Sequence, residues 1–420
     1  MDHKKQVWAA LNHKEPERIP IDFGGANVTS MHVTCVAALR DYYGLEKRLV
    51  KVHEPIQLLG WIDEDLKEVL GIDMDCPFPP STGFGFANEN WKEWKMPGRD
   101  LVVLVPEKFN IETEANGDIY MYPQGDKTAP PSGIMPSGGF YFDALMRQDP
   151  IDEDALDPED NLEEYGIISD SEIDVLADRV REAAAEGRAV VGKINGTAFG
   201  DIARVPAVQL KHPKGIRDVT EWYMSIATRP DYIHAVFAKQ CEYALENLRK
   251  LNEKCGSYID VFYICGTDFG TQTSTFCSAA TYRNLYMPYY KRINDWIHAN
   301  TSWKTFKHSC GAVASFMNDF IESGFDIINP VQCSAKGMDP KHLKEAYGDR
   351  LVFWGGGVDT QKTLPFGTPE EVRREVLQRC EIFSPGGGFV FNAVHNIQAD
   401  TPIENIVAMF DAVREFNGLK

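Results

Sequence analysis

Short apolar runs alternate with longer amphipathic segments from about Gly187 to the end of the chain. The runs are apolar at consecutive positions, a pattern typical of parallel strands that are covered on both faces. They lie at 189–196, 258–270, 304–311, 325–332, 350–359 and 387–396. Together with a first strand expected in 18–25, they predict an α/β fold, namely a (β/α)8 TIM barrel, with a doubly wound open sheet as the alternative.

The rest of the chain is expected to elaborate this one domain, which spans 1–420. An N-terminal helical extension precedes the first strand. Residues 85–165 form an insertion with a β-hairpin that turns at Asn116-Gly117 and a loop rich in proline and glycine. Thr368 and Thr401 are each followed by proline and, three positions on, by glutamate, which predicts two helix capping boxes.

The charge balance excludes some classes of partner. The 420 residues include 62 acidic and 43 basic side chains, a formal net charge of -19 at pH 7, which repels nucleic acid and anionic membranes. No apolar run approaches the roughly 18 residues of a membrane span, and the N-terminus has no apolar signal segment, so we expect a cytoplasmic protein. Nine cysteines, an odd number, favour reduced thiols or metal ligands over a disulfide framework.

Polar side chains lie at the ends of several predicted strands, where a barrel places its functional loops. The candidates are Asp22, Tyr263, Asp268, His308, Cys310, Asn329, Gln332, Cys333 and His395. Asp268 is the expected catalytic acid or hydrogen-bonding group. The residues expected to bind substrate are Tyr263, Asn329, Gln332 and Asp22. Each of these side chains also fits a purely structural role.

His308-Ser309-Cys310 places an imidazole and a thiol one residue apart at the end of a predicted strand. Because side chains alternate along a strand, both point to one face, and nitrogen and sulfur are the usual zinc donors. A catalytic zinc needs a third protein ligand, for which Cys333 and His395 are both candidates. The alternative is that the pair only marks a buried strand end.

Longer stretches of the chain resemble the uroporphyrinogen decarboxylase superfamily. They are "HSCGAVASFMNDFIESGFDIINPVQ", "KGMDPKHLKEAYGDRLVFWGGGVDTQ", "LPFGTPEEVRREV" and "GGGFVFNAVHNIQADTPIENI". The resemblance is dense over about 260–416 and thinner before it, where "RIPIDFGG" still resembles the family's first strand. It implies a barrel that houses either tetrapyrrole decarboxylation or zinc-dependent methyl transfer between corrinoid proteins and small substrates.

Two features distinguish these branches. Tetrapyrrole decarboxylases carry an arginine motif after the first strand, which this sequence lacks, whereas His308 and Cys310 match the zinc motif of the methyltransferases. Methyltransferases that activate a thiol have a cysteine near the position of His395. A histidine there favours a more Lewis-acidic zinc that acts on a substrate oxygen.

The resemblance therefore implies a zinc-dependent methyltransferase that moves a methyl group between a small, O-methylated compound and a corrinoid such as methylcobalamin. The chain has no "DxHxxG" sequence of the type that ligates cobalt, so a separate corrinoid-binding protein is the expected partner. A homodimer is compatible with the sequence. A thiol as the methyl acceptor, a tetrapyrrole decarboxylase and a non-catalytic binding barrel stay open as alternatives.

Overall fold

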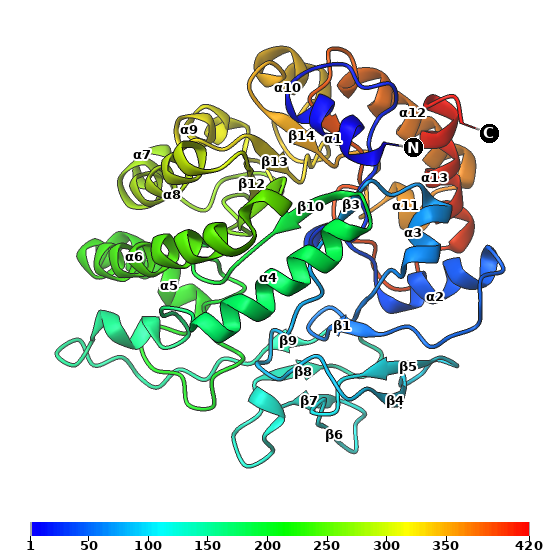
Figure 1. Cartoon of the computed structure of the whole chain (residues 1–420). Coiled ribbons are helices and arrows are strands. Elements are labelled where there is room, and N and C mark those ends of the chain that lie inside the picture. The colour runs from blue at the N-terminus through cyan, green and yellow to red at the C-terminus, as the bar shows by residue number, and fades with distance from the viewer. Residues whose placement is uncertain (1, 420) are drawn as a thin grey trace.

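The predicted parallel strands form one seven-stranded sheet in the computed structural model, which describes residues 2–419 (Figure 1). The sheet order is β15-β14-β13-β12-β11-β10-β3, and all neighbouring strands are parallel. The strands are β3 (Met74–Asp75), β10 (Ala189–Gly192), β11 (Val261–Cys265), β12 (Lys304–His308), β13 (Ile327–Asn329), β14 (Val352–Trp354) and β15 (Phe389–Val390). The α/β prediction is confirmed, and β3 is a strand that the apolar pattern did not predict.

The segment expected as the first strand connects the two edge strands of this sheet. Ile21 forms a single parallel bridge with Phe391, in which Asp22 N–H donates to the Phe391 carbonyl (2.9 Å) and Phe391 N–H donates to the Pro20 carbonyl (2.8 Å). On its other side, Asp73 N–H donates to the Ile21 carbonyl (2.8 Å). This short segment thus lies between β15 and β3, and the sheet has a TIM-barrel-like form.

Helices surround the sheet, as Figure 1 shows. They are α1 (His3–Leu11), α2 (Val33–Tyr42), α3 (Glu64–Leu70), α4 (Asp170–Ala185), α5 (Val219–Thr228), α6 (Pro230–Cys255), α7 (Ala279–Thr281), α8 (Met287–Asn300), α9 (Met317–Glu322), α10 (Pro340–Tyr347), α11 (Thr363–Phe366), α12 (Pro369–Phe383) and α13 (Ile403–Phe416). Within residues 2–419, no helix combines the length and the apolar composition that crossing a bilayer requires.

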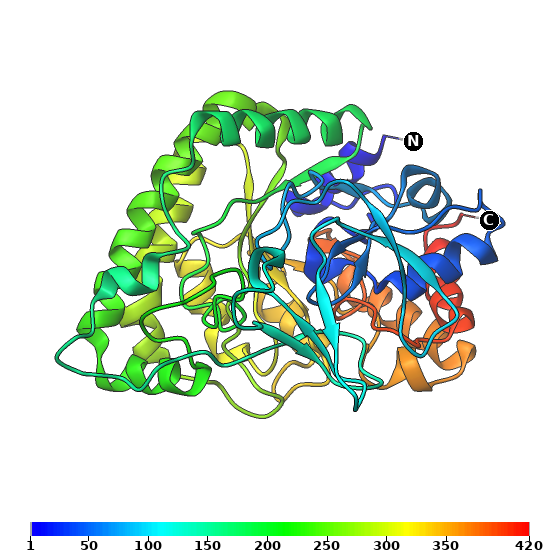
Figure 2. The ribbon, with the colours of Figure 1, turned by 90° about the horizontal axis from the view of Figure 1, so that it is seen from below.

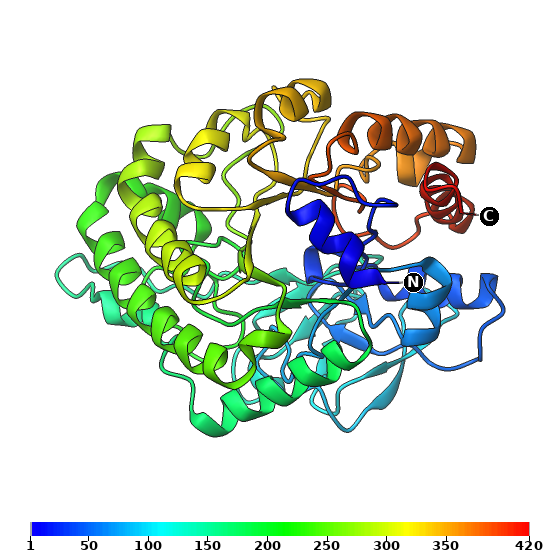
Figure 3. The same cartoon turned by 45° about the horizontal axis from the view of Figure 1, so that its top comes forward.

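Helix α1, the predicted N-terminal extension, covers the amino end of the barrel-like sheet (Figure 3). Val7 belongs to one buried cluster with inward-facing strand residues such as Val191 and Trp354. The helix is bonded to residues that precede strands: Trp8 Nε1–H donates to Asp260 (2.7 Å), and Gly388 N–H donates to an α1 carbonyl (3.0 Å). The carboxyl end of the strands is therefore the end left for a site.

Antiparallel strands fill much of the predicted insertion. They are β4 (Lys92–Lys95), β5 (Val102–Val105), β6 (Ile111–Thr113), β7 (Ile119–Met121), β8 (Gly133–Met135) and β9 (Asp143–Ala144), preceded by the pair β1 (Val52–Glu54) and β2 (Leu59–Gly60). The hairpin β6–β7 turns at Asn116-Gly117 as predicted. Lys211, in the loop that follows β10, forms an ion pair with Asp126 of the insertion (2.6 Å). The insertion thus borders the carboxyl end of the sheet, and Figure 2 shows it in front of the strands.

One of the two predicted capping boxes is wrong. Thr368 accepts the Glu371 N–H and caps α12 as expected. Helix α13 instead begins at Ile403 with Pro402 in the cap position, because the Thr401 hydroxyl donates to the Gln398 carbonyl (2.9 Å) in the preceding turn.

Asp22 is a buried carboxyl group inside the barrel-like sheet. Its side chain accepts hydrogen bonds from Trp354 Nε1–H (2.9 Å) and from Gly25 N–H (2.8 Å), and the residue is 1% exposed. Burial, only partly offset by these hydrogen bonds, raises the pKa of Asp22 from 3.8 to about 6.

This pKa predicts a pH dependence of stability. A folded-state pKa above that of the unfolded chain stabilises the fold below about pH 4, and this contribution is lost as the pH rises through about 6. We expect the free energy of unfolding of the wild type to fall by about 2 kcal/mol between pH 4 and 7 relative to Asp22→Asn. Urea titrations of both proteins across this range measure it, and a difference that does not change with pH would contradict the prediction.

Candidate metal centre

Three potential metal ligands meet at the carboxyl end of the sheet. The donor atoms of His308, Cys310 and His395 all lie within 4.8 Å of one another. His308 ends β12 and, by strand alternation, faces the barrel interior like Phe306, which belongs to the inner cluster. Cys310 follows two residues later, and its Sγ lies 3.3 Å from His308 Nε2. The His-x-Cys spacing therefore brings both donors to one point.

Asn329 holds the His308 ring in one orientation. The two residues are paired across β12 and β13, and His308 Nδ1 lies 2.6 Å from Asn329 Oδ1. The amide nitrogen of Asn329 donates to the Trp354 carbonyl (2.8 Å), so its oxygen is the atom that faces the ring. His308 Nδ1 is therefore the protonated nitrogen, and Nε2 presents a lone pair toward Cys310.

His395 is oriented in the same way by a different amide. It lies five residues beyond the end of β15, and its Nδ1 is 2.6 Å from Asn396 Oδ1. The Asn396 amide nitrogen donates to Gln57 Oε1, which again leaves the amide oxygen for the ring. The two imidazole rings lie at a centroid distance of 5.4 Å. Outer hydrogen bonds of this kind are typical of metal-binding histidines.

The donor set fits a zinc ion with an open coordination position. Two imidazole nitrogens and one sulfur match the three protein ligands of a catalytic zinc. Burial lowers the pKa of His308 to about 4 and also lowers that of His395, so both rings are neutral and able to ligate. Burial, and then the nearby Asp268 carboxylate, raise the pKa of the Cys310 thiol. A bound divalent cation would reverse this last effect and favour the thiolate.

The structure does not place Cys333 in this cluster. Its Sγ lies 3.5 Å from the Val331 carbonyl. The charged groups with the largest influence on its pKa are Arg379 and Glu375 of α12. The turn after β13 therefore directs this thiol toward the helix layer. Of the two candidates for a third ligand, His395 is the one that joins His308 and Cys310.

Most of the residues predicted to bind substrate have structural partners instead. Asn329 is fully buried and contacts the His308 ring. The Asp22 carboxyl group accepts hydrogen bonds from Trp354 and Gly25. The side-chain oxygen of Gln332, which is 6% exposed, accepts the N–H of Gly311 (2.8 Å) and so supports the loop that carries Cys310. These contacts favour supporting roles over substrate binding.

Among the predicted catalytic and substrate-binding residues, Tyr263 and Asp268 keep the clearest solvent contact. The Asp268 side chain is 28% exposed; its Oδ1 accepts the Cys310 N–H (2.7 Å) and lies 3.8 Å from His308 Nε2. Tyr263 is partly exposed and follows the inward-facing Val261 by two positions on β11. Asp268 thus borders the ligand cluster, and Tyr263 faces the same barrel interior from β11, in register with Phe306 of β12.

Sequence reasoning missed Lys307, a fully buried lysine that has no carboxylate partner among residues 2–419. Its ammonium group donates to the Thr267 carbonyl (2.7 Å) and to the His308 carbonyl (3.0 Å), and lies 3.2 Å from Cys265 Sγ. It also lies 4.7 Å from the ring centroid of Phe269. Lys307 therefore ties the ligand-bearing end of β12 to the loop after β11. The signal available in the sequence was a lysine between Phe306 and His308, in a strand expected to be covered on both faces.

The orienting role of Asn329 gives a prediction about metal affinity. We expect Asn329→Ala to weaken zinc binding by about ten- to a hundredfold, because the His308 ring loses the acceptor that fixes its orientation and its protonated nitrogen. Asn329→Asp keeps an acceptor and should retain more affinity. Competition with a chromophoric chelator measures the dissociation constants. The control is Asn300→Ala, at an exposed position at the end of α8. Equal affinity of Asn329→Ala and the wild type would contradict this role.

Comparison with solved structures gives a match to the whole fold. A methyltransferase from Methanosarcina mazei superposes with a TM-score of 0.55 over 99% of this chain and 99% of that chain, at 16% sequence identity. At this identity the likeness establishes the fold only. The barrel-like α/β architecture is therefore one that a known enzyme also adopts.

Comparison with characterised sequences gives shorter matches. The uroporphyrinogen decarboxylases of Psychromonas ingrahamii and Pseudoalteromonas translucida are 36% and 35% identical over 89 residues, which cover 20% of this chain and 24% of each relative. The matches thus span about a quarter of these relatives' length. The family model for uroporphyrinogen decarboxylase (URO-D) matches residues 207–416, half of the chain. The chain belongs to the uroporphyrinogen decarboxylase family.

Proposed function

We propose that this protein is a zinc-dependent methyltransferase that moves a methyl group between a small O-methylated compound and a corrinoid held by a separate protein. The observation that carries the proposal is the convergence of His308, Cys310 and His395, with donor atoms within 4.8 Å of one another. Both imidazoles are held by amide oxygens in the tautomer that a metal ligand needs.

In this proposal the chain's own residues hold and orient the reacting groups. Bound to the three ligands, zinc would supply Lewis acidity at a substrate oxygen or sulfur. Asp268 fixes the Cys310 backbone, and Asn329 and Asn396 fix the two rings, so the ligand set is preorganised. Asp268, whose side chain is 28% exposed, borders the side of the cluster that solvent reaches. Positioning of this kind supplies a large share of the rate acceleration in group-transfer reactions.

Arg18, at the start of the first-strand segment, is not free to bind the carboxylates of a tetrapyrrole. A polyanionic substrate requires cationic side chains that are free to bind it. Arg18 instead forms a buried fork with Asp73, with Nη–Oδ distances of 2.7 and 2.5 Å. Asp73 lies directly before β3, at the amino end of the sheet and away from the ligand cluster.

A spectroscopic assay tests the proposal. Zinc-loaded protein is mixed with chemically reduced cob(I)alamin and a methoxylated aromatic compound, and methylcob(III)alamin formation is followed by absorbance. We expect methyl transfer that depends on the substrate and is abolished in Cys310→Ala. Release of carbon dioxide from uroporphyrinogen, with no methyl transfer to any corrinoid or thiol, would instead favour the decarboxylase.

A further inference from the structure

Two cationic side chains of the described residues, both at the carboxyl end of the sheet, form no ion pair with an acidic residue. Within residues 2–419, neither Lys193 nor Arg204 forms an ion pair or a side-chain hydrogen bond with another residue. Other cations in the same part of the chain are paired, such as Lys211 with Asp126 and Arg217 with Glu164. In a chain with a formal charge of -19, two free cations in one region need an explanation.

Lys193 points into the carboxyl end of the barrel-like sheet. It follows β10, whose residues Ala189 and Val191 face the inner cluster, so alternation directs Lys193 to the same side. Its side chain is exposed to solvent, yet burial lowers its pKa. Lys193 is thus surrounded by protein while still reached by water, as expected for a group that lines a binding site.

Arg204 lies close to Lys193, on the loop that follows β10. Thr197 Oγ1–H donates to the Ile264 carbonyl (2.6 Å), and Thr267 Oγ1–H donates to the Phe199 carbonyl (2.9 Å), which fixes this loop against β11. Arg204 is exposed, and its charge lowers the pKa of Lys193. It also opposes the rise in pKa of Tyr263, whose hydroxyl group and the Asp201 carboxylate both lie against Gly266, directly after β11. The two cations and the metal ligands therefore share one end of the sheet.

Within the described residues, the neighbouring carboxyl groups form no ion pair with Lys193 or Arg204. Both oxygens of Glu54 accept backbone N–H groups, from Ile56 (3.1 Å) and Gln57 (2.8 Å). Asp201 accepts the backbone N–H of Ala203 (3.1 Å). Burial raises the pKa of both Glu54 and Asp201, and the positive charge of Arg204 opposes the rise at each. These carboxyl groups thus attract the cations only from beyond ion-pair distance, so the N–H groups of both cations stay free to bind a ligand.

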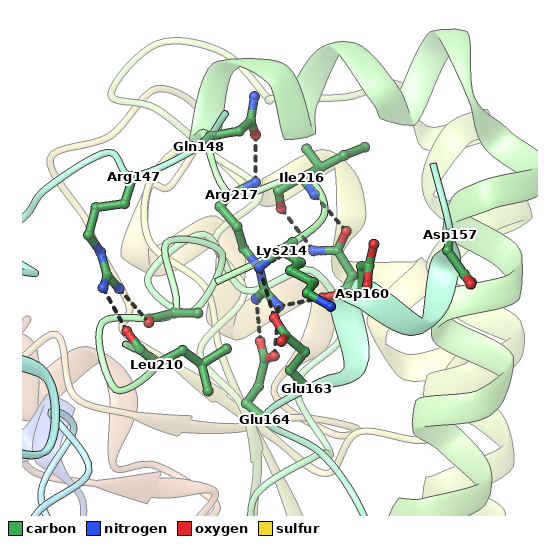
Figure 4. A network of polar contacts seen from close by, with 12 residues as sticks. Arg147, Gln148, Asp157, Asp160, Glu163, Glu164, Leu210, Lys214, Ile216 and Arg217 are labelled. Atoms are coloured by element: carbon green, nitrogen blue, oxygen red, sulfur yellow. Dashed lines mark hydrogen bonds and ion pairs between the residues drawn. The ribbon is translucent and has the colours of Figure 1, made fainter. Parts of the chain in front are cut away.

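A network of arginines fixes the rest of the Arg204 loop (Figure 4). Arg147 donates to the carbonyls of Ala207 (2.8 Å) and Leu210 (2.6 Å). Arg217, which is 1% exposed, donates to Glu164 through both terminal nitrogens (2.8 and 3.0 Å). These contacts join the loop to the last part of the insertion. The loop is therefore held in place before any ligand binds, which lowers the cost of ordering Arg204 on binding.

We propose that Lys193 and Arg204 form an anion-binding subsite that recognises a carboxylate group on the methyl-bearing substrate. The proposal deepens the proposed function and rests on it for the identity of that substrate. A carboxylate held by an ammonium and a guanidinium group makes charge-assisted hydrogen bonds, which are the stronger kind. Such a subsite would hold one end of the substrate while its methoxy group faces the cluster of His308, Cys310 and His395.

Calorimetric titration of the purified, zinc-loaded protein tests the subsite. The probe is 4-methoxybenzoate, methoxybenzene is its uncharged counterpart, and inorganic phosphate represents other anions. We expect 4-methoxybenzoate to bind about tenfold or more weakly to Lys193→Met and to Arg204→Met, with partial recovery in Arg204→Lys. Lys341→Met removes a positive charge at an exposed position of α10. This variant should bind 4-methoxybenzoate like the wild type.

Several results would overturn the subsite. They are equal affinity of the wild type, Lys193→Met and Arg204→Met, no binding of 4-methoxybenzoate to the wild type, and binding of methoxybenzene or phosphate as tight as that of 4-methoxybenzoate. Failure of the proposed function is a separate result, because these titrations need neither corrinoid nor turnover. A protein that binds the carboxylate through both cations but transfers no methyl group would keep the subsite and lose the methyltransferase.

Discussion

Cys310→Ser should purify with almost no zinc, whereas Cys333→Ser should retain about one zinc ion per chain. Cys310 supplies the only sulfur in the cluster with His308 and His395, and Cys333 lies outside that cluster. Loss of an outer hydrogen bond to a ligand costs about ten- to a hundredfold in metal affinity, so loss of the ligand itself should exceed a hundredfold. We expect His395→Ala to behave like Cys310→Ser.

Elemental analysis of protein purified without added metal measures the zinc content directly. Cys333→Ser is the matched control, because it makes the same chemical change at a thiol of similar burial that lies after the neighbouring strand. Far-ultraviolet circular dichroism separates loss of metal from loss of fold. Zinc retained in Cys310→Ser but lost in Cys333→Ser would assign the third ligand to Cys333 and overturn the cluster.

The contrast between His395 and Cys333 shows where sequence reasoning about the site ends. Alternation along an extended segment was enough to place His308 and Cys310 together, because both belong to one strand and its first loop residues. Cys333 and His395 both lie four or more residues beyond a strand end. In such loops no regular alternation fixes the direction in which a side chain points. Their direction depends on loop contacts, such as that of Asn396 with Gln57, which join segments far apart in the sequence.

The same limit applies to the fold and to the proposed subsite. Runs apolar on both faces identified six of the seven parallel strands, including the two-residue β15. The sequence around β3, Ile72-Asp73-Met74-Asp75, contains no such run. Lys193 continued the alternation of Ala189 and Val191, so its inward direction was accessible from the sequence. Arg204 lies in a loop without regular structure, and only its tertiary anchors bring it near Lys193.

Asp73 is the buried carboxylate that fixes the segment between β15 and β3. It accepts the guanidinium fork of Arg18, the Ile21 N–H (2.8 Å) and a contact from His3 Nδ1 (2.8 Å), and it is fully buried. Because Ile21 itself forms only one β-bridge, this segment depends on Asp73 more than a full strand would. Removal of the charge would also leave the Arg18 guanidinium buried without a counter-ion.

We therefore expect Asp73→Asn to lower the free energy of unfolding by about 3–5 kcal/mol, the usual cost of breaking a buried ion pair from one side. Urea denaturation at pH 7 of zinc-free protein measures this, since bound metal would add its own stabilisation. Asp100→Asn, which removes a fully exposed partner of Lys95, should change stability by less than about 0.5 kcal/mol. Replacing both partners, as Arg18→Met with Asp73→Leu, should recover part of the loss because no charge then stays buried. A destabilisation of Asp73→Asn no larger than that of Asp100→Asn would mean that backbone pairing alone holds the first segment in the barrel-like sheet.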